Sequence, residues 1–261
     1  MLSKKMIYGF ISSLFLMSFS VSAADLNEIL KSGEVKIAVP EAFAPFGSVG
    51  KTGEHEGYDV DVAKLIAKDL GVKLKIVPVV SKQRIPFLET DKVDLVISTM
   101  GANPSRAKSI NFSSAYAPFY SGVFAPSSIK VSSYADLDGL TIGVTGGTLE
   151  DLELTKMAPK GAKITRFGDN AATLSAIKSK QVQVLVAGNT VAASVTEANP
   201  DFDLERKFII KDSPCFIGVK KGNEDLLRWV NVFILHKKLG GDLNKISLKW
   251  LGQDLPSLPS L

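Results

Sequence analysis

A single arginine follows a loop of small residues near the middle of the chain. Arg106 lies in the stretch 98–116, which reads S-T-M-G-A-N-P-S-R-A-K-S-I-N-F-S-S-A-Y. Small residues leave backbone N–H groups uncovered, and a neighbouring guanidinium binds a planar anion through two parallel hydrogen bonds. The stretch therefore predicts a carboxylate site with Arg106 at its centre.

A second candidate anion site begins at Thr148, which follows two glycines and starts a predicted helix over 148–157. The hydroxyl and the free N–H groups of the first helical turn are suited to bind an anion. The same hydroxyl is also suited to cap the helix, with Asp151 three residues further on. The two roles are compatible.

Predicted strands and helices alternate in two similar halves. In the first half the strands cover 35–39, 73–80 and 94–99, and the helices cover 58–70 and 84–88. In the second half the strands cover 140–144, 163–167 and 182–186, and the helices cover 148–157 and 171–179. After these come a helix over 189–199 with an asparagine cap, strands over 208–210 and 216–219, and a long helix over 225–239. The alternation predicts two α/β lobes, each a helix-covered, mostly parallel sheet.

Ligands of open α/β sheets bind beyond the carboxyl ends of the strands. The functional residues are therefore expected just after Val39, Thr99, Val144 and Val186. The segments that follow these strands contain neither histidine nor cysteine. Neither a metal site nor a histidine-based catalytic triad is predicted there.

The first 24 residues have the layout of a secretory signal. Lys4 and Lys5 precede an apolar run over 7–19 and the small residues V-S-A-A. The apolar run is shorter than the ~18 residues that a membrane-spanning helix needs. We expect cleavage near Ala24, and a mature protein that is not inserted in the membrane.

The only cysteine, Cys215, has no partner for an intrachain disulfide and is expected to be a small buried apolar residue.

Charge and length limit the possible functions. Without the two lysines of the signal, 29 basic residues face 27 acidic ones, and the positive charges are dispersed. Nucleic acid is therefore not an expected partner. The mature chain is long enough for one large domain or two small ones.

Six motifs together resemble those of one family. They are G-Y-D-V-D-V-A at 57–63, R-I-P-F-L at 84–88, K-V-D-L-V-I at 92–97, S-R-A-K-S-I-N-F-S at 105–113, G-G-T at 146–148 and G-V-K-K-G-N at 218–223. With them the chain resembles the family 3 solute-binding proteins of bacterial amino-acid uptake systems, two-lobed periplasmic receptors for an ABC transporter. The resemblance implies a type II periplasmic-binding-protein fold, a periplasmic location, an inner-membrane ABC permease as partner and a monomer. It implies no cofactor and no catalytic residue.

The resemblance also implies the division of the chain. The first lobe is expected over 25–122 and the second over 123–214, with residues 215–261 returning to the first lobe and forming C-terminal helices. The two crossings between the lobes, near Gly122 and near Cys215, would act as a hinge. The lobes would close on a small ligand that carries a carboxylate.

By the resemblance, Arg106 binds the α-carboxylate of the ligand, and Thr148 reaches the same group from the second lobe. Thr99 and Gly101 stand seven and five positions before the arginine. Thr99 would offer its hydroxyl, whereas Gly101 has only its N–H to offer. Phe43 would place its ring over the ligand, and the role of its neighbour Phe46, in the cleft or in the core, stays open.

Arg84 and Asn189 bear on the identity of the ligand. Family members with an arginine like Arg84 bind acidic amino acids, so the expected ligand is a polar or acidic amino acid such as glutamate or aspartate. Asn189, or Gly188 before it, stands where the family has an aspartate that pairs with the ligand ammonium, and an amide carries no charge. Glu41 and Glu150 are the carboxylates that could approach from other loops.

Two alternatives follow from this departure. One is a receptor for a carboxylate without an α-ammonium group. The other is an enzyme that resembles the periplasmic dehydratases built on the same scaffold, which would need a general acid in the cleft. Glu41 and Glu150 are the only candidates for that acid in the strand-end loops.

Overall fold

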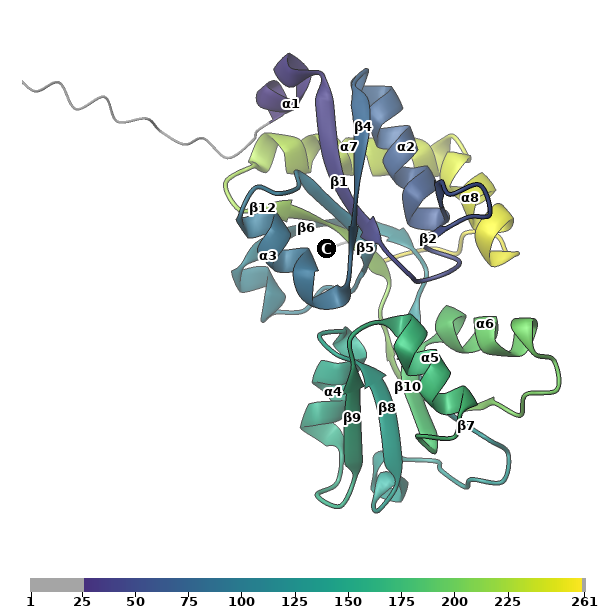
Figure 1. Ribbon diagram of the computed structural model, residues 1–261. Helices are drawn as coiled ribbons and strands as arrows, with labels where there is room; N and C mark the ends of the chain where they lie inside the picture. The colour runs from purple at the N-terminus through teal and green to yellow at the C-terminus, as the bar shows by residue number, and fades with distance from the viewer. Residues whose placement is uncertain (1–25, 260–261) are drawn as a thin grey trace, which may run out of the picture.

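Two five-stranded sheets, each covered by helices, form the upper and lower lobes in Figure 1. The computed structural model describes residues 26–259. The strand order is β4-β1-β5-β12-β6 in the first lobe and β11-β7-β10-β8-β9 in the second. Strands β2 and β3 form a separate two-stranded sheet. The α/β, two-lobed architecture expected from the sequence is confirmed.

The first lobe is built from both ends of the described chain. Its strands are β1 (Glu34–Pro40), β4 (Lys73–Val79), β5 (Leu95–Met100), β6 (Ile110–Ala117) and β12 (Cys215–Lys220), beside the short β2 (Ser48–Val49) and β3 (His55–Glu56). Its helices are α1 (Leu26–Ser32), α2 (Tyr58–Leu70), α3 (Arg84–Glu89), α7 (Glu224–Leu239) and α8 (Asp242–Leu251), with short 3-10 turns at Ser81–Gln83 and Arg106–Lys108.

The second lobe is a middle segment of the chain. Its strands are β7 (Tyr120–Ala125), β8 (Thr141–Thr145), β9 (Lys163–Phe167), β10 (Val184–Gly188) and β11 (Glu205–Asp212). Its helices are α4 (Leu149–Met157), α5 (Asn170–Lys178) and α6 (Asn189–Ala198), with a 3-10 turn at Tyr134–Leu137.

Each sheet mixes parallel and antiparallel pairs. Strand β1 pairs in parallel with β4 and β5, whereas β12 runs antiparallel to β5 and β6. In the second lobe β8 pairs in parallel with β9 and β10, and β7 runs antiparallel to β10 and β11. The antiparallel strands β6, β7, β11 and β12 are those that carry the chain between the lobes. The parallel core of each sheet therefore directs the carboxyl ends of β1, β5, β8 and β10 toward the other lobe.

The two crossings lie side by side. Strand β6 ends at Ala117 in the first sheet, and Tyr120 already pairs with Asp212 in the second sheet. The first crossing is thus at 118–119, earlier than the expected boundary after Gly122, while the second is at 213–214. The backbone N–H of Ser213 donates a hydrogen bond of 2.9 Å to the carbonyl of Phe119, which ties the two crossings together.

Helix α2 has the bounds that the sequence predicts, because Gly71 ends it in the left-handed conformation. Its two acidic residues differ in environment. Asp61 accepts hydrogen bonds from Lys249 Nζ at 2.6 Å and from Trp250 Nε1 at 2.8 Å, and so holds α8 against α2. Asp59 is fully buried beneath the strand ends. The sequence predicted C-terminal helices without bounds for α8, and it did not predict the burial of Asp59.

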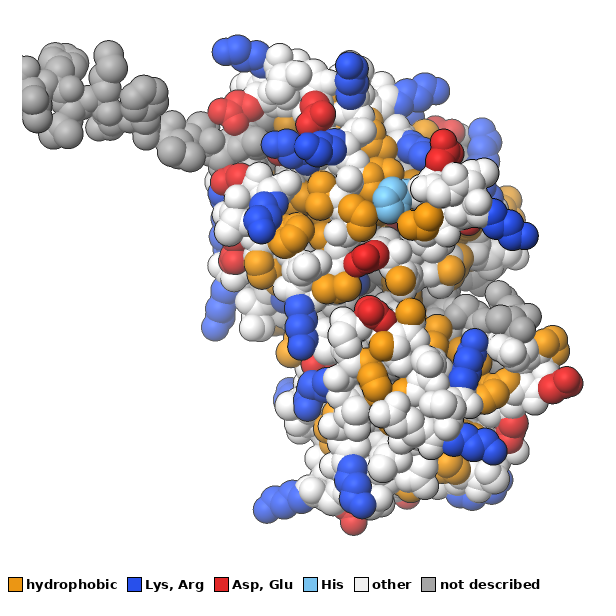
Figure 2. All heavy atoms as spheres, in the orientation of Figure 1, with side chains coloured by type: hydrophobic (Ala, Val, Ile, Leu, Met, Phe, Trp, Pro, Cys, Tyr) orange, Lys and Arg blue, Asp and Glu red, His pale blue; other side chains and the backbone are white. Residues whose placement is uncertain are grey.

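The charged side chains are dispersed over the surface, as the sequence indicates. Figure 2 shows basic and acidic side chains interspersed over one face of both lobes. Among residues 26–259, no helix combines the length and the apolar character that crossing a bilayer requires. The export signal expected over 1–24 lies outside the described residues.

Gly57 precedes α2 and should be intolerant of a side chain. Its φ is +135°, and a Cβ there would lie 2.3 Å from the carbonyl oxygen of Phe46. We expect Gly57→Ala to lower the free energy of unfolding by at least about 2 kcal/mol in urea denaturation, since it adds backbone strain to overpacking. Gly168→Ala is the matched control, because nothing lies within 4 Å of its added Cβ. Equal losses in the two variants would contradict the steric explanation.

Candidate functional site

The four strand ends that face the other lobe line one narrow pocket between the lobes, with a cavity volume of about 20 Å³. Its walls come from the loop after β1, the end of β5, the start of α4 and the end of β10. The lining residues are Phe43, Arg84, Thr99, Gly101, Arg106, Phe119, Thr145, Thr148, Leu149, Glu150, Asn170, Val186, Ala187, Gly188, Val191 and Ser213. The pocket thus brings together six of the seven ligand-binding residues expected from the sequence.

Arg106 is buried and bridges the lobes. Its Nη1 donates to the carbonyl of Gly101 at 2.8 Å, and its Nη2 donates to the carbonyl of Gly147, in the second lobe, at 2.9 Å. Burial lowers the pKa of the guanidinium, and the charge of Glu150 opposes that shift. Only 8% of the residue is exposed, so a solvated surface role is excluded.

Arg84 is the second buried cation of the pocket, with 6% of the residue exposed. Its Nε donates to Ser98 Oγ at 3.1 Å. Burial and, to a lesser extent, the charge of Arg106 together lower the pKa of Arg84 to about 10, against the opposing effect of Glu150. Both guanidiniums therefore remain charged at neutral pH and repel each other. Neither forms an ion pair within 4 Å with any other residue of the described chain.

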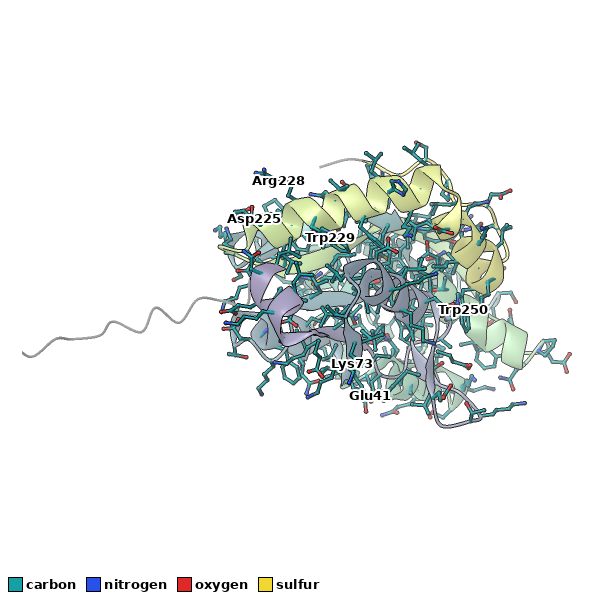
Figure 3. All side chains as sticks on the ribbon, turned by 90° about the horizontal axis from the view of Figure 1, so that it is seen from above. Glu41, Lys73, Asp225, Arg228, Trp229 and Trp250 are labelled. Atoms are coloured by element: carbon teal, nitrogen blue, oxygen red, sulfur yellow. The ribbon has the colours of Figure 1, made fainter. Side chains whose placement is uncertain are left out.

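Glu150 is the only carboxylate among the described residues that line the pocket. It is buried in the first turn of α4, where the helix dipole favours a negative charge. Its Oε1 accepts a hydrogen bond of 3.0 Å from Ser121 Oγ. Glu41, the other carboxylate considered from the sequence, is exposed and lies on the side of the molecule opposite α7 in Figure 3. It lines a smaller adjoining pocket, which shares Phe43 and Arg84 with the first.

Thr99 lines the pocket in a strained conformation. Its φ is +47°, a left-handed value that is rare for a β-branched residue. Its Oγ1 donates a hydrogen bond of 2.8 Å to Asp59 Oδ2, away from the ligand site. The hydroxyl hydrogen that the sequence assigned to the ligand carboxylate is thus already used. Strain of this kind is concentrated at functional sites.

Gly101 is a point of close approach between chain segments. A Cβ at this position would lie 2.3 Å from Ser213 Oγ and 2.9 Å from Leu149 Cδ2 of the second lobe. The sequence suggested a small residue with a free N–H. The structure adds that the carbonyl of Gly101 holds Arg106 in place.

The hydroxyl hydrogen of Thr148 is also already used. It donates to the carbonyl of Thr145 at 2.9 Å and accepts from the N–H of Asp151 at 3.2 Å, as a helix cap does. Thr148 therefore has the expected capping role, and the N–H groups at the start of α4 remain the means by which it could contact an anion. Asp151 in turn accepts a hydrogen bond of 3.0 Å from the N–H of Gly147.

Phe43 and Phe119 form an aromatic wall of the pocket. Their ring centroids lie 6.2 Å apart in an edge-to-face arrangement. Phe46 packs behind them, 5.6 Å from Phe43 and 5.9 Å from Phe119, fully buried and outside the pocket. Phe119 was not singled out in the sequence because the strands on either side of it, β6 and β7, were not predicted. Its ring also fills the space that a Cβ at Gly188 would need, which explains the glycine at that position.

Asn189 does not line the pocket, although the sequence made it a candidate. Its Oδ1 accepts a hydrogen bond of 3.2 Å from the N–H of Tyr120, at the first crossing. The expectation that it caps α6 is wrong, because Gly188 holds the cap position and no side-chain cap bond is present. This hydrogen bond thus links α6 to the first crossing between the lobes.

Asp59 lies behind the pocket as a buried carboxyl. Its Oδ1 accepts a hydrogen bond of 2.6 Å from Tyr116 Oη, while its Oδ2 is bonded to Thr99. Burial raises the pKa of Asp59 to about 7, and the bonds from Tyr116 and Thr99 and the charge of Arg84 limit the rise. The free thiol of Cys215 is also buried nearby, and burial raises its pKa.

No cluster of three or more metal-binding side chains occurs in the chain between residues 26 and 259. The site instead combines buried guanidiniums, one carboxylate, helix-start N–H groups and aromatic rings at an interlobe cleft. These groups define a class of two-lobed receptors for small charged organic molecules.

Comparison with known proteins places the chain within that class. The family described as bacterial extracellular solute-binding proteins, family 3, matches residues 35–253, and the chain belongs to it. A relative is the ABC transporter glutamine-binding protein of Bacillus subtilis, 30% identical over 78% of this chain and 75% of its own length.

Two solved structures are similar. The solute receptor for L-cysteine of Neisseria gonorrhoeae is 31% identical, with a TM-score of 0.81, over 87% of this chain and 94% of its own. A reconstructed ancestral amino acid-binding protein, described as a precursor of cyclohexadienyl dehydratase, is 30% identical, with a TM-score of 0.80, over 86% of this chain and 98% of its own. The similar proteins named here are thus binding proteins, one of which preceded an enzyme.

The raised pKa of Asp59 predicts how stability depends on pH. Its folded-state pKa of about 7 exceeds the ordinary value of 3.8, so between these pH values the folded protein holds a proton that the unfolded chain has lost. The free energy of unfolding should therefore fall as pH rises through this interval, by up to about 1.4 kcal/mol per pH unit from this group, and level off above about pH 7.

Urea denaturation at several pH values tests this prediction. We expect Asp59→Asn to remove this part of the slope, since an amide does not titrate. An unchanged slope in Asp59→Asn would show that the carboxyl is not the group responsible.

Proposed function

We propose that this protein is the periplasmic receptor of an ABC importer and that it binds an amino acid with a second carboxylate, such as glutamate or aspartate. The observation that carries the proposal is the pair of buried guanidiniums, Arg84 and Arg106, which form no ion pair within 4 Å with any described residue. A buried charge without a partner is costly, so the pocket favours a ligand that brings anionic groups to both.

The charges of the pocket complement those of an acidic amino acid. Arg106, with the N–H groups at Gly101 and at the start of α4, binds the α-carboxylate. Arg84 binds the side-chain carboxylate, and Glu150 pairs with the α-ammonium group. Glu150 supports this assignment because it is buried in the pocket and acts on the pKa of both arginines. It supplies the carboxylate that Asn189 lacks, so an amino acid is favoured over a carboxylate without an ammonium group.

Binding is coupled to closure of the lobes. Arg106 and Arg84 belong to the first lobe, and Thr148 and Glu150 to the second, so one ligand contacts both sets only when the lobes are together. The hydrogen bond from Arg106 to Gly147 already spans the lobes. The paired crossings at 118–119 and 213–214 are the hinge, and the closed monomer is the form that the inner-membrane permease recognises.

The protein binds its ligand and releases it without converting it. The glutamine-binding protein of Bacillus subtilis and the L-cysteine receptor support a receptor, whereas the ancestral precursor of a dehydratase shows that the scaffold has also led to an enzyme. Incubation with L-glutamate followed by chromatography should return the ligand unchanged. Any turnover would contradict this part of the proposal.

Arg106→Ala should weaken binding of L-glutamate by more than about 100-fold in isothermal titration calorimetry, because the α-carboxylate would be buried without its counter-charge. Arg228→Ala is the matched control, since Arg228 is exposed on α7 on the far side of the first lobe (Figure 3). A tenfold loss or less in Arg106→Ala would contradict the role of this residue.

Arg84→Gln should separate the two carboxylates. We expect the variant to lose at least about tenfold in affinity for L-glutamate but to change little for L-glutamine, whose side chain carries no charge to pair with Arg84. Competition of both ligands in the same calorimetric assay measures the ratio. If the two affinities fall equally, Arg84 supports the fold of the pocket and does not select the side chain.

A further inference from the structure

The hydroxyl of Thr99 has one hydrogen and two lone pairs. Its hydrogen is donated to Asp59 Oδ2 at 2.8 Å, in the buried layer behind the pocket. With its hydrogen donated, the hydroxyl can only accept further hydrogen bonds, through the lone pairs of its oxygen. A hydroxyl that only accepts is matched to a donor such as an ammonium group and is mismatched to a carboxylate.

Asp59 fixes this direction through its own geometry. The side chain is fully buried, does not line the pocket, and is fixed at both oxygens, by Tyr116 at 2.6 Å and by Thr99. Tyr116 is itself held, since its carbonyl accepts a hydrogen bond of 3.0 Å from Tyr58 Oη. In its ionised form the carboxylate accepts and does not donate, so both hydroxyls must then direct their hydrogens at it.

The strained backbone of Thr99 adds to the same conclusion. A φ of +47° costs free energy in a β-branched residue, and the bond to Asp59 helps to hold the side chain there. Thr99 lies at the carboxyl end of β5, and Glu150 faces the same pocket from the second lobe. The two residues thus line the pocket from opposite lobes, and each has a side-chain oxygen that is able to accept a hydrogen bond.

The geometry points to Asp59 as a positioning residue that makes Thr99 a hydrogen-bond acceptor for the ligand ammonium, with Glu150 as the opposite acceptor. The inference rests on the proposed function only in requiring an amino-acid ligand. It reverses the role expected for Thr99, which was to donate to the carboxylate.

Charged and titratable groups from several elements surround Asp59, and its ionisation state is the property that the experiment follows. Arg84 acts on it from α3, Tyr116 from β6 and Cys215 from β12, with Tyr58 beside it on α2. Protonation of Asp59 would let its carboxyl donate to Thr99 Oγ1 and would free the threonine hydrogen to turn toward the pocket. The acceptor would then become a donor, and the ammonium would lose a partner.

Paired probes isolate the ammonium group. L-glutamate and glutarate differ by that group alone, as do L-glutamine and 5-amino-5-oxopentanoate. The ratio of affinities within a pair is measured by calorimetry for the full protein. In Asp59→Asn the amide donates to Thr99, so we expect the ratio to fall roughly 10- to 100-fold, chiefly through weaker binding of the amino acid. Asp61→Asn, on the same helix and bonded to α8, should leave the ratio unchanged.

A merely structural role for Asp59 would weaken both members of a pair equally, and that result would overturn the inference. Three further results are expected. In the wild type the ratio falls as pH drops below about 7, which requires no variant. Thr99→Val, which removes the acceptor, lowers the ratio by itself. Asp59→Asn added to Thr99→Val lowers it no further, whereas additive losses would contradict a pathway through Thr99.

The pairs also separate this inference from the proposed function. Binding of the glutamine pair but not the glutamate pair would overturn the dicarboxylic ligand and leave the test of Thr99 intact. Binding of acids without any preference for an ammonium group would overturn both.

Discussion

The structure depends on two guanidiniums that are held out of water beside each other. Arg84 and Arg106 repel, and burial lowers the pKa of each. Carbonyl oxygens of Gly101 and Gly147 and the hydroxyl of Ser98 satisfy some of their N–H groups. These dipoles hold the guanidiniums in place but do not neutralise them. In the proposed function, this positive charge, only partly offset by Glu150, attracts an anion, and its position between the lobes couples anion binding to closure.

The hydroxyl groups around these two arginines already have hydrogen-bond partners within the protein. The hydroxyls of Thr99 and Thr148 donate to Asp59 and to the carbonyl of Thr145, so neither hydrogen is left for a carboxylate. In the proposed function, anion binding therefore depends on guanidiniums and backbone N–H groups, which only donate. The oxygen acceptors then receive the ligand ammonium. The separation of donors from acceptors gives the pocket a polarity that residue types alone do not reveal.

Much of the fold follows from the sequence, because α2 and β9 have strong periodic patterns with defined ends. The pocket follows as well, since parallel strands place the residues after Val39, Thr99, Val144 and Val186 at one edge. The crossing strands β6 and β7 were not predicted, because they are fixed by pairing with strands distant in sequence. Phe119 and the burial of Asp59 were missed for the same reason. Asn189 was a candidate from one aligned position, but its amide oxygen bonds the N–H of Tyr120 at the first crossing and the residue does not line the pocket. The described carboxylate that does line it, Glu150, lies in the first turn of α4.

A crystal structure of the protein with L-glutamate tests the central claim most directly. The predicted complex has the α-carboxylate on Arg106, the side-chain carboxylate on Arg84, and the ammonium nitrogen within hydrogen-bond distance of Glu150 and Thr99 Oγ1. A ligand whose ammonium lies away from Glu150, or whose second carboxylate does not contact Arg84, would contradict it.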